Sequence, residues 1–156
     1  MKYARFRIVL LGLAPLVLFG CAGTLTPSHK DPAQYTRLDA AVEDCDLPQI
    51  KELINENPVS VNEAGWSNTS PLYLAALNNC TQVAVFLIDH GANVNAKAKG
   101  DVTPLHIAAQ KGNLDLVKIL LSHKADAHAL DDKGRSPRDR ALQWGHPEVA
   151  RFLDSQ

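Results

Sequence analysis

The sequence of 156 residues contains none of the short motifs that commonly mark a catalytic or metal site. It has no Cys-x-x-Cys pair, no His-Glu-x-x-His helix, no glycine-rich phosphate loop and no Gly-x-Ser-x-Gly elbow. The carboxylates Asp89, Asp115, Asp126 and Glu148 are spaced as solvent-facing residues, whereas a hydrolytic pair must face one pocket across about 5–9.5 Å. We therefore expect a protein that is not an enzyme and that needs no cofactor and no metal.

Excess positive charge is also missing, because 16 Lys and Arg residues stand against 17 Asp and Glu residues. Removal of the first twenty residues would take away Lys2, Arg5 and Arg7 and lower the formal net charge from −1 to −4. Nucleic-acid binding needs a basic face, so this balance argues against it. One local cluster of basic residues is the exception, and it comprises Lys133, Arg135, Arg138 and Arg140. It could be a solvated polar cap on the last repeat, or it could contact an acidic patch on a protein or lipid headgroups.

No hydrophobic run approaches the roughly 20 residues of a membrane-spanning helix. The run from Ile8 to Phe19 covers only twelve residues and follows a basic start, Met1 to Arg7, as in a secretion signal. Leu18-Phe19-Gly20-Cys21 stands at its end and resembles the bacterial lipoprotein signal. That resemblance implies a signal peptide over 1–20, acylation of Cys21 and a tether over 21–34. An ordinary cleaved signal peptide with an incidental Cys21 is the alternative.

The residue after Cys21 bears on location. By resemblance to lipoprotein sorting in Gram-negative bacteria, Ala22 in place of an Asp implies the outer membrane. We therefore expect a lipid-anchored protein that faces the periplasm. Several acyl chains would anchor it stably where one chain would not.

A period of 33 residues dominates the remainder of the chain, in blocks that start at Ser70, Thr103 and Ser136. Each block begins with Ser or Thr followed by Pro, which is typical of a helix N-cap and first helical residue. Helices are predicted from 70 to 77, 81 to 89, 103 to 111 and 114 to 121. The small apolar residues of the first helix of each pair favour close packing of a neighbour.

These blocks resemble the ankyrin repeat. The resemblance implies an all-α solenoid of about four helix-turn-helix repeats with short hairpin fingers over 35–156, divided near 35–67, 68–100, 101–133 and 134–156. The first repeat is degenerate and the last is polar, as the ends of a solenoid require. In this family the position of His106 usually bonds neighbouring loop backbone, so a structural role is expected there; Tyr73 and Asp139 fill the same slot.

Cys45 and Cys80 would remain in an oxidising compartment after acylation of Cys21. The repeat register places both at the helix–helix turns of adjacent repeats. A disulfide between them requires Cα atoms nearer than about 7 Å, whereas packed helices lie about 8–10 Å apart. A bridge and two buried thiols both fit the sequence.

Ankyrin domains bind proteins through finger tips and the exposed side of the first helices, so the resemblance implies a protein partner on this concave face. Trp66 and Trp144 are natural anchors, although each could instead pack on its own repeat. Lys99, Lys111 and Arg135 suit a partner with acidic residues around an apolar centre. The full predicted set is Trp66, Ser67, Thr69, Leu77, Asn78, Lys99, Val102, Gln110, Lys111, Lys133, Arg135 and Trp144.

The sequence therefore predicts a monomeric protein-binding module tethered to the bacterial envelope. Two alternatives stay open. One is an inhibitor or immunity protein that neutralises a periplasmic toxin or enzyme. The other is an envelope enzyme whose site carries no familiar motif. A scaffold would bind without inhibiting, an inhibitor would block its partner, and an enzyme would turn over substrate alone.

Overall fold

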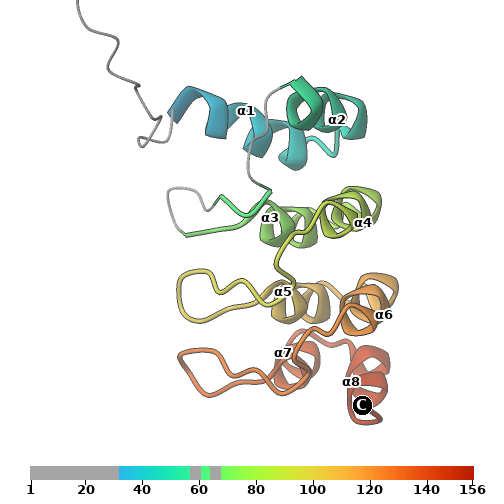
Figure 1. The fold of residues 1–156 in the computed structure, drawn as a ribbon. Coiled ribbons are helices and arrows are strands. Elements are labelled where there is room, and N and C mark those ends of the chain that lie inside the picture. Colours follow the sequence, from blue (N-terminus) through green and yellow to red (C-terminus); the bar gives the residue numbers. More distant parts are fainter. Residues whose placement is uncertain (1–31, 57–60, 64–67) are drawn as a thin grey trace, which may run out of the picture.

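The computed structural model describes residues 32–56, 61–63 and 68–156. These residues form eight α-helices and no strand (Figure 1). The helices are α1 (Pro32–Glu43), α2 (Leu47–Glu56), α3 (Pro71–Leu77), α4 (Thr81–Asp89), α5 (Pro104–Gln110), α6 (Leu114–Ser122), α7 (Pro137–Gln143) and α8 (Pro147–Leu153).

Consecutive helices form antiparallel pairs that stack as successive layers (Figure 1). The first helices of the pairs pack on one another in the order α1, α3, α5, α7, and behind them α4 contacts α6 and α6 contacts α8. Long loops leave the stack on the side of the first helices (Figure 1). The predicted all-α solenoid is confirmed. Its first helix begins at Pro32, ahead of the predicted boundary at residue 35.

Local capping explains where the first helices begin. Ser70, Thr103 and Ser136 have extended backbones and occupy the N-cap positions of α3, α5 and α7, each followed by a proline. The Ser70 hydroxyl accepts a hydrogen bond from the backbone N–H of Tyr73 at 3.2 Å. The N-cap residue satisfies a helix N–H group that has no partner within the helix, and proline presets the backbone angle of the first turn.

Each first helix ends at a left-handed residue at the same register position. These residues have positive φ angles of 55° at Cys45, 63° at Asn79, 72° at Gly112 and 81° at Gly145. A left-handed residue reverses the chain after a helix. The four turns therefore return the second helix of every repeat against the first in the same way.

One continuous apolar core runs through the stack. Ala75, Ala76, Ala108 and Ala109 are fully buried between first helices, where their small side chains let neighbouring layers approach closely. Larger side chains fill the space between the first and second helices, among them the fully buried Leu72, Leu87, Leu105, Leu116 and Leu120. Each layer completes the core of the next, so a single repeat could not bury its apolar face.

The C-terminal end of the stack carries a charged pair where inner repeats carry leucine. Arg138 and Asp154 stand one period after Leu105 and Leu121, and the Arg138 Nε atom donates to an oxygen of Asp154. Both side chains are about half exposed, at 43% and 49%. The pair makes this end of the described stack polar.

Candidate functional site

The finger between α4 and α5 and the finger between α6 and α7 are closed loops joined to each other. The backbone N–H of Ala98 donates to the carbonyl of Val102 at 2.9 Å, and Asp131 donates equivalently to Arg135 at 3.0 Å. The Asp132 N–H then donates to the Gly100 carbonyl at 2.9 Å. These bonds order the two fingers and present Lys99 and Lys133, both exposed, on their outer parts.

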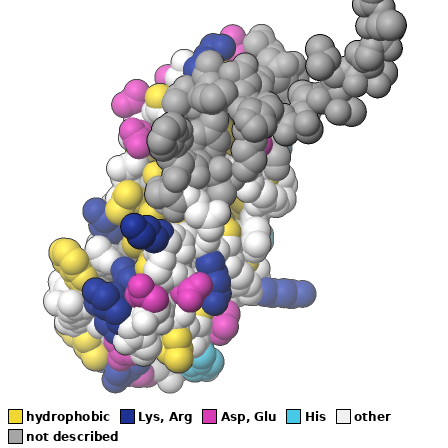
Figure 2. All heavy atoms as spheres, turned by 90° about the vertical axis from the view of Figure 1, so that its left-hand side faces the viewer, with side chains coloured by type: hydrophobic (Ala, Val, Ile, Leu, Met, Phe, Trp, Pro, Cys, Tyr) yellow, Lys and Arg dark blue, Asp and Glu magenta, His cyan; other side chains and the backbone are white. Residues whose placement is uncertain are grey.

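A row of exposed side chains follows the C-terminal ends of the first helices. Asn78, Lys111 and Trp144 cap α3, α5 and α7 at intervals of one period, and all three are exposed. Trp144 leaves 58% of its surface in contact with solvent. Figure 2 faces the finger side and shows hydrophobic, basic and acidic side chains together on its lower part. The row thus joins apolar and charged groups on neighbouring layers.

Beneath the last finger, one buried carboxylate holds two guanidinium groups. Asp131 Oδ2 accepts from Arg135 Nε at 2.9 Å and from Arg140 at 3.1 and 2.8 Å. Its other oxygen accepts from the backbone N–H groups of Lys133 and Arg135. Burial alone raises the pKa of the Asp131 carboxyl, but these hydrogen bonds outweigh burial and hold that pKa well below its usual value.

His106 joins α5 to the same finger. Its Nε2 atom lies 3.0 Å from the carbonyl oxygen of Arg135, and its Nδ1 atom accepts from the Thr103 backbone N–H at 3.2 Å. Because a carbonyl only accepts, Nε2 carries the proton. Burial lowers the pKa of the fully buried His106 ring more than the bond to the Arg135 carbonyl raises it. A neutral histidine thus supports the finger, as the resemblance implied.

Comparison with known families identifies the repeats. Residues 67–99 match the family model described as ankyrin repeat, and residues 87–141 match the model described as ankyrin repeats in many copies. Residues 67–141 are thus similar to ankyrin repeats in sequence. An ankyrin repeat protein of Rickettsia bellii (strain RML369-C) is 41% identical over 56 residues, which cover 34% of this chain and 8% of that relative. The chain therefore spans less than a tenth of this relative's length.

Several of the predicted partner-binding residues are exposed in the structure. These are Asn78, Lys99, Lys111, Lys133 and Trp144. Thr69 and Leu77 are half-buried, and Leu77 packs against the core. Trp66, Ser67 and Cys21 lie outside the described residues, as does the whole predicted signal peptide.

Val102 was predicted on the partner-facing surface, and this prediction is wrong. Only 6% of the Val102 side chain is exposed, because it turns into the core while its carbonyl closes the finger. Arg135, one period after Val102, is only partly exposed, and its guanidinium donates hydrogen bonds to the Asp131 and Gln143 side chains. Gln110 is half-buried and accepts from Arg140 at 2.9 Å.

The basic cluster expected at the end of the chain is divided by the fold. Arg140 is buried against Asp131 and Gln110, so it is not part of a solvated cap. Arg138 pairs with Asp154, and Lys133 stands on the finger. The sequence shows four neighbouring cations, but only their packing reveals that one of them is internal. The complementary signal in the sequence was Asp131, a carboxylate nine residues before Arg140.

In residues 32–56, 61–63 and 68–156, no three His, Cys, Asp or Glu side chains are grouped so that they could hold a metal ion. None of the helices found there is both long enough and apolar enough to cross a membrane.

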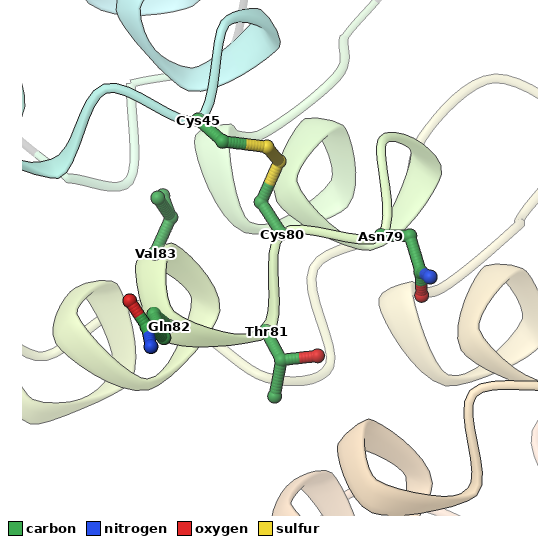
Figure 3. Close-up of a pocket in the computed structure, with 6 residues that line it drawn as sticks. All are labelled: Cys45, Asn79, Cys80, Thr81, Gln82 and Val83. Atoms are coloured by element: carbon green, nitrogen blue, oxygen red, sulfur yellow. A yellow bond between two sulfur atoms is a disulfide. The ribbon is translucent and has the colours of Figure 1, made fainter.

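Cys45 and Cys80 are joined by a disulfide in the structure, with their Cα atoms 5.6 Å apart (Figure 3). The bond links the turn between α1 and α2 to the N-cap of α4. Turns of neighbouring repeats thus approach more closely than the roughly 8–10 Å that separates packed helix axes. Beside the bond lies an open hollow of about 330 Å³, lined by Cys45, Asn79, Cys80, Thr81, Gln82 and Val83.

Proposed function

We propose that this chain is a non-enzymatic protein-binding module held at the bacterial envelope by an acylated Cys21. Ankyrin repeats favour protein interaction, since stacked repeats form extended surfaces suited to that task. The lipoprotein-like sequence before Cys21 supports the anchor, and Ala22 supports the outer membrane as its place. The observation that carries the binding role is the exposed row of Asn78, Lys111 and Trp144.

Trp144 is the proposed anchor of the interface. Large aromatic side chains carry much of the binding energy at interfaces, and an exposed Trp gains most from being covered. A partner pocket of apolar side chains would accept Trp144.

Lysines give the surrounding surface its charge. Lys99, Lys111 and Lys133 are exposed on the fingers and the row, and Asp101 is offset by an ion pair with Lys97 at 3.7 Å. A partner with acidic residues around its apolar centre complements this arrangement, and such charges steer association more than they add affinity.

The test is capture in living cells. The full chain with Cys21 intact is crosslinked in its own host, and partners of the wild type are compared with those of Trp144→Ala/Lys111→Ala. Glu148→Ala/Arg151→Ala, two exposed residues of α8, is the matched control. We expect one dominant partner that the first variant loses and the control retains. Equal capture by both variants would reject this surface.

Two further readouts separate the parts of the proposal. Cys21→Ala should move the protein from the membrane to the soluble fraction, and unchanged fractionation would reject the anchor. The captured partner's activity, measured with and without the purified chain, distinguishes a scaffold from an inhibitor or immunity protein. Turnover of a substrate by the chain alone would favour the enzyme alternative.

A further inference from the structure

The second helix of the third repeat begins at a residue that contacts the preceding repeat. Asn113, the N-cap of α6, donates to the Asn79 side chain at 2.5 Å and accepts from the Leu116 backbone N–H at 2.9 Å. Cys80 occupies the equivalent position one period earlier, at the N-cap of α4, and its reach to Cys45 is the disulfide. The covalent bond therefore stands where the next layer has a hydrogen bond.

Because cysteine stands at position 80 where the next layer has Asn113, the start of α4 has no side-chain cap. Asn113 caps α6 through its oxygen, whereas Cys80 makes no side-chain cap hydrogen bond while it is oxidised. Val83 stands one period before Leu116, so its backbone N–H is the group that a side-chain cap of α4 would bind. Val83 lines the hollow beside the disulfide together with Thr81 and Gln82. The helix dipole adds partial positive charge at this end of the nine-residue helix.

The two cysteines differ in their exposure. Cys45 is an exposed residue, whereas Cys80 is 5% exposed. Both line the hollow beside the disulfide (Figure 3). A thiol arriving from solvent therefore meets the Cys45 side of the bond.

We propose that the Cys45–Cys80 disulfide is a site of thiol–disulfide exchange with small thiols or the reactive thiol of another protein. The incoming thiolate attacks Sγ of Cys45, a new S–S bond forms there, and the Cys45–Cys80 bond breaks with its electron pair leaving on Sγ of Cys80. A second thiolate then displaces Cys45 from the mixed disulfide. The protein gains two electrons, and two thiols are oxidised to one disulfide.

The start of α4 stabilises the leaving group. A Cys80 thiolate would accept from the Val83 N–H, as the Asn113 oxygen accepts from Leu116. Cysteine at a helix N-terminus forms a thiolate more readily, and a better leaving group speeds exchange. Once protonated, the Cys80 thiol can donate to the carbonyl oxygens of Val42 and Asn78, each 3.6 Å from Sγ.

Exchange would change how the first repeat is held. In the oxidised chain the disulfide ties the α1–α2 turn to α4, while α1 also packs on α3 and Lys51 of α2 lies over the Phe86 ring of α4. In the reduced chain only non-covalent contacts remain between them. Exchange at this link between the first two repeats does not depend on the partner-binding surface.

The test uses the full wild-type chain and reduced glutathione as the thiol. Mixed disulfides are quenched with acid and mapped by peptide mass spectrometry, in buffer and again in urea that unfolds the chain. We expect the native adduct on Cys45 and a native rate within about tenfold of the unfolded rate, because the attacked sulfur belongs to an exposed residue beside the hollow. An adduct on Cys80, or a native rate slower than that limit, would overturn the proposal.

A second measurement tests the leaving group. The Cys45→Ser variant is titrated by thiolate absorbance, after circular dichroism has shown that it folds, with Cys80→Ser as the matched control. We expect the Cys80 thiol to have a pKa at least about one unit below the 8.5 of free cysteine. A value at or above that of free cysteine would mean that α4 does not assist departure. If Cys45→Ser does not fold, the glutathione mapping decides alone.

Discussion

Asp131 in the last finger accepts two hydrogen bonds from the guanidinium of Arg140 on α7, at 3.1 and 2.8 Å. Both side chains are buried, and the equivalent positions before Arg140 are the apolar Ile107 and Leu74. Arg140 also reaches Gln110 on α5 at 2.9 Å. An ionic contact thus joins three elements at a place where the inner repeats rely on apolar packing.

Removal of the Asp131 charge should destabilise the last repeat strongly. Asp131→Ala leaves Arg140 buried without its counter-charge, and breaking a buried pair from one side costs about 3–5 kcal/mol. The neighbouring Asp132→Ala is the control, because Asp132 is exposed, and a change within about 0.5 kcal/mol is expected. Urea denaturation measures both. Equal effects of the two substitutions would contradict the role of the buried pair.

Acid should weaken the fold in two stages. The folded-state pKa of His106 lies below the ordinary value of about 6.5, so its stabilisation is present above that pH and is lost as pH falls through the folded value. The lowered pKa of Asp131 adds stability above about pH 4 that is lost in stronger acid. Unfolding free energies measured across this range should show both losses.

One variant assigns the upper stage to its residue. His106→Gln should flatten the dependence just below about pH 6.5, because it removes the group whose pKa is lowered there, and it should leave the loss in stronger acid, which belongs to Asp131. If the wild type and His106→Gln showed parallel curves below pH 6.5, the first stage would belong to other groups.

Two glycine substitutions separate backbone strain from a steric clash. Gly112 and Gly145 have φ angles of 72° and 81°, so alanine at either position pays the left-handed penalty of about 1–2 kcal/mol. A Cβ atom on Gly112 would lie 2.5 Å from Nδ1 of His146, whereas one on Gly145 would meet nothing within 4 Å. We expect Gly112→Ala to lower the melting temperature more than Gly145→Ala. Equal shifts would show that the His146 ring moves aside without cost.

Loss of the disulfide should destabilise the chain without changing its fold. The bond joins residues separated by 35 in sequence, and the loop-entropy relation predicts a loss of about 3–4 kcal/mol in Cys45→Ser/Cys80→Ser. Cys45→Asn/Cys80→Asn is the companion variant, because it rebuilds the Asn79–Asn113 contact of the next layer. We expect it to recover part of the lost stability in urea denaturation. A serine pair as stable as the wild type would mean that the bond constrains little.

Local features of this fold follow from the residues themselves. The period of 33 residues, the Ser-Pro and Thr-Pro caps, and Gly112 at the turn predict the four helices between residues 70 and 121 almost to the residue, since capping and turn geometry act within a few positions of the chain. The same period predicts the stack, because a helix pair with one apolar face needs a neighbour to cover it.

Which side chains face a partner depends on packing between layers. Val102 and Arg140 occupy positions that the pattern leaves open or polar, yet Val102 is buried in the apolar core and Arg140 is buried against Asp131. The contacts that decide this, such as His106 with Arg135 and Arg140 with Gln110, join residues about one repeat apart. The approach of Cys45 to Cys80 also depends on how two turns lean together, and no short stretch of sequence encodes that separation. Helices and period are local properties of this chain, whereas burial and side-chain pairing exist only after the layers have stacked.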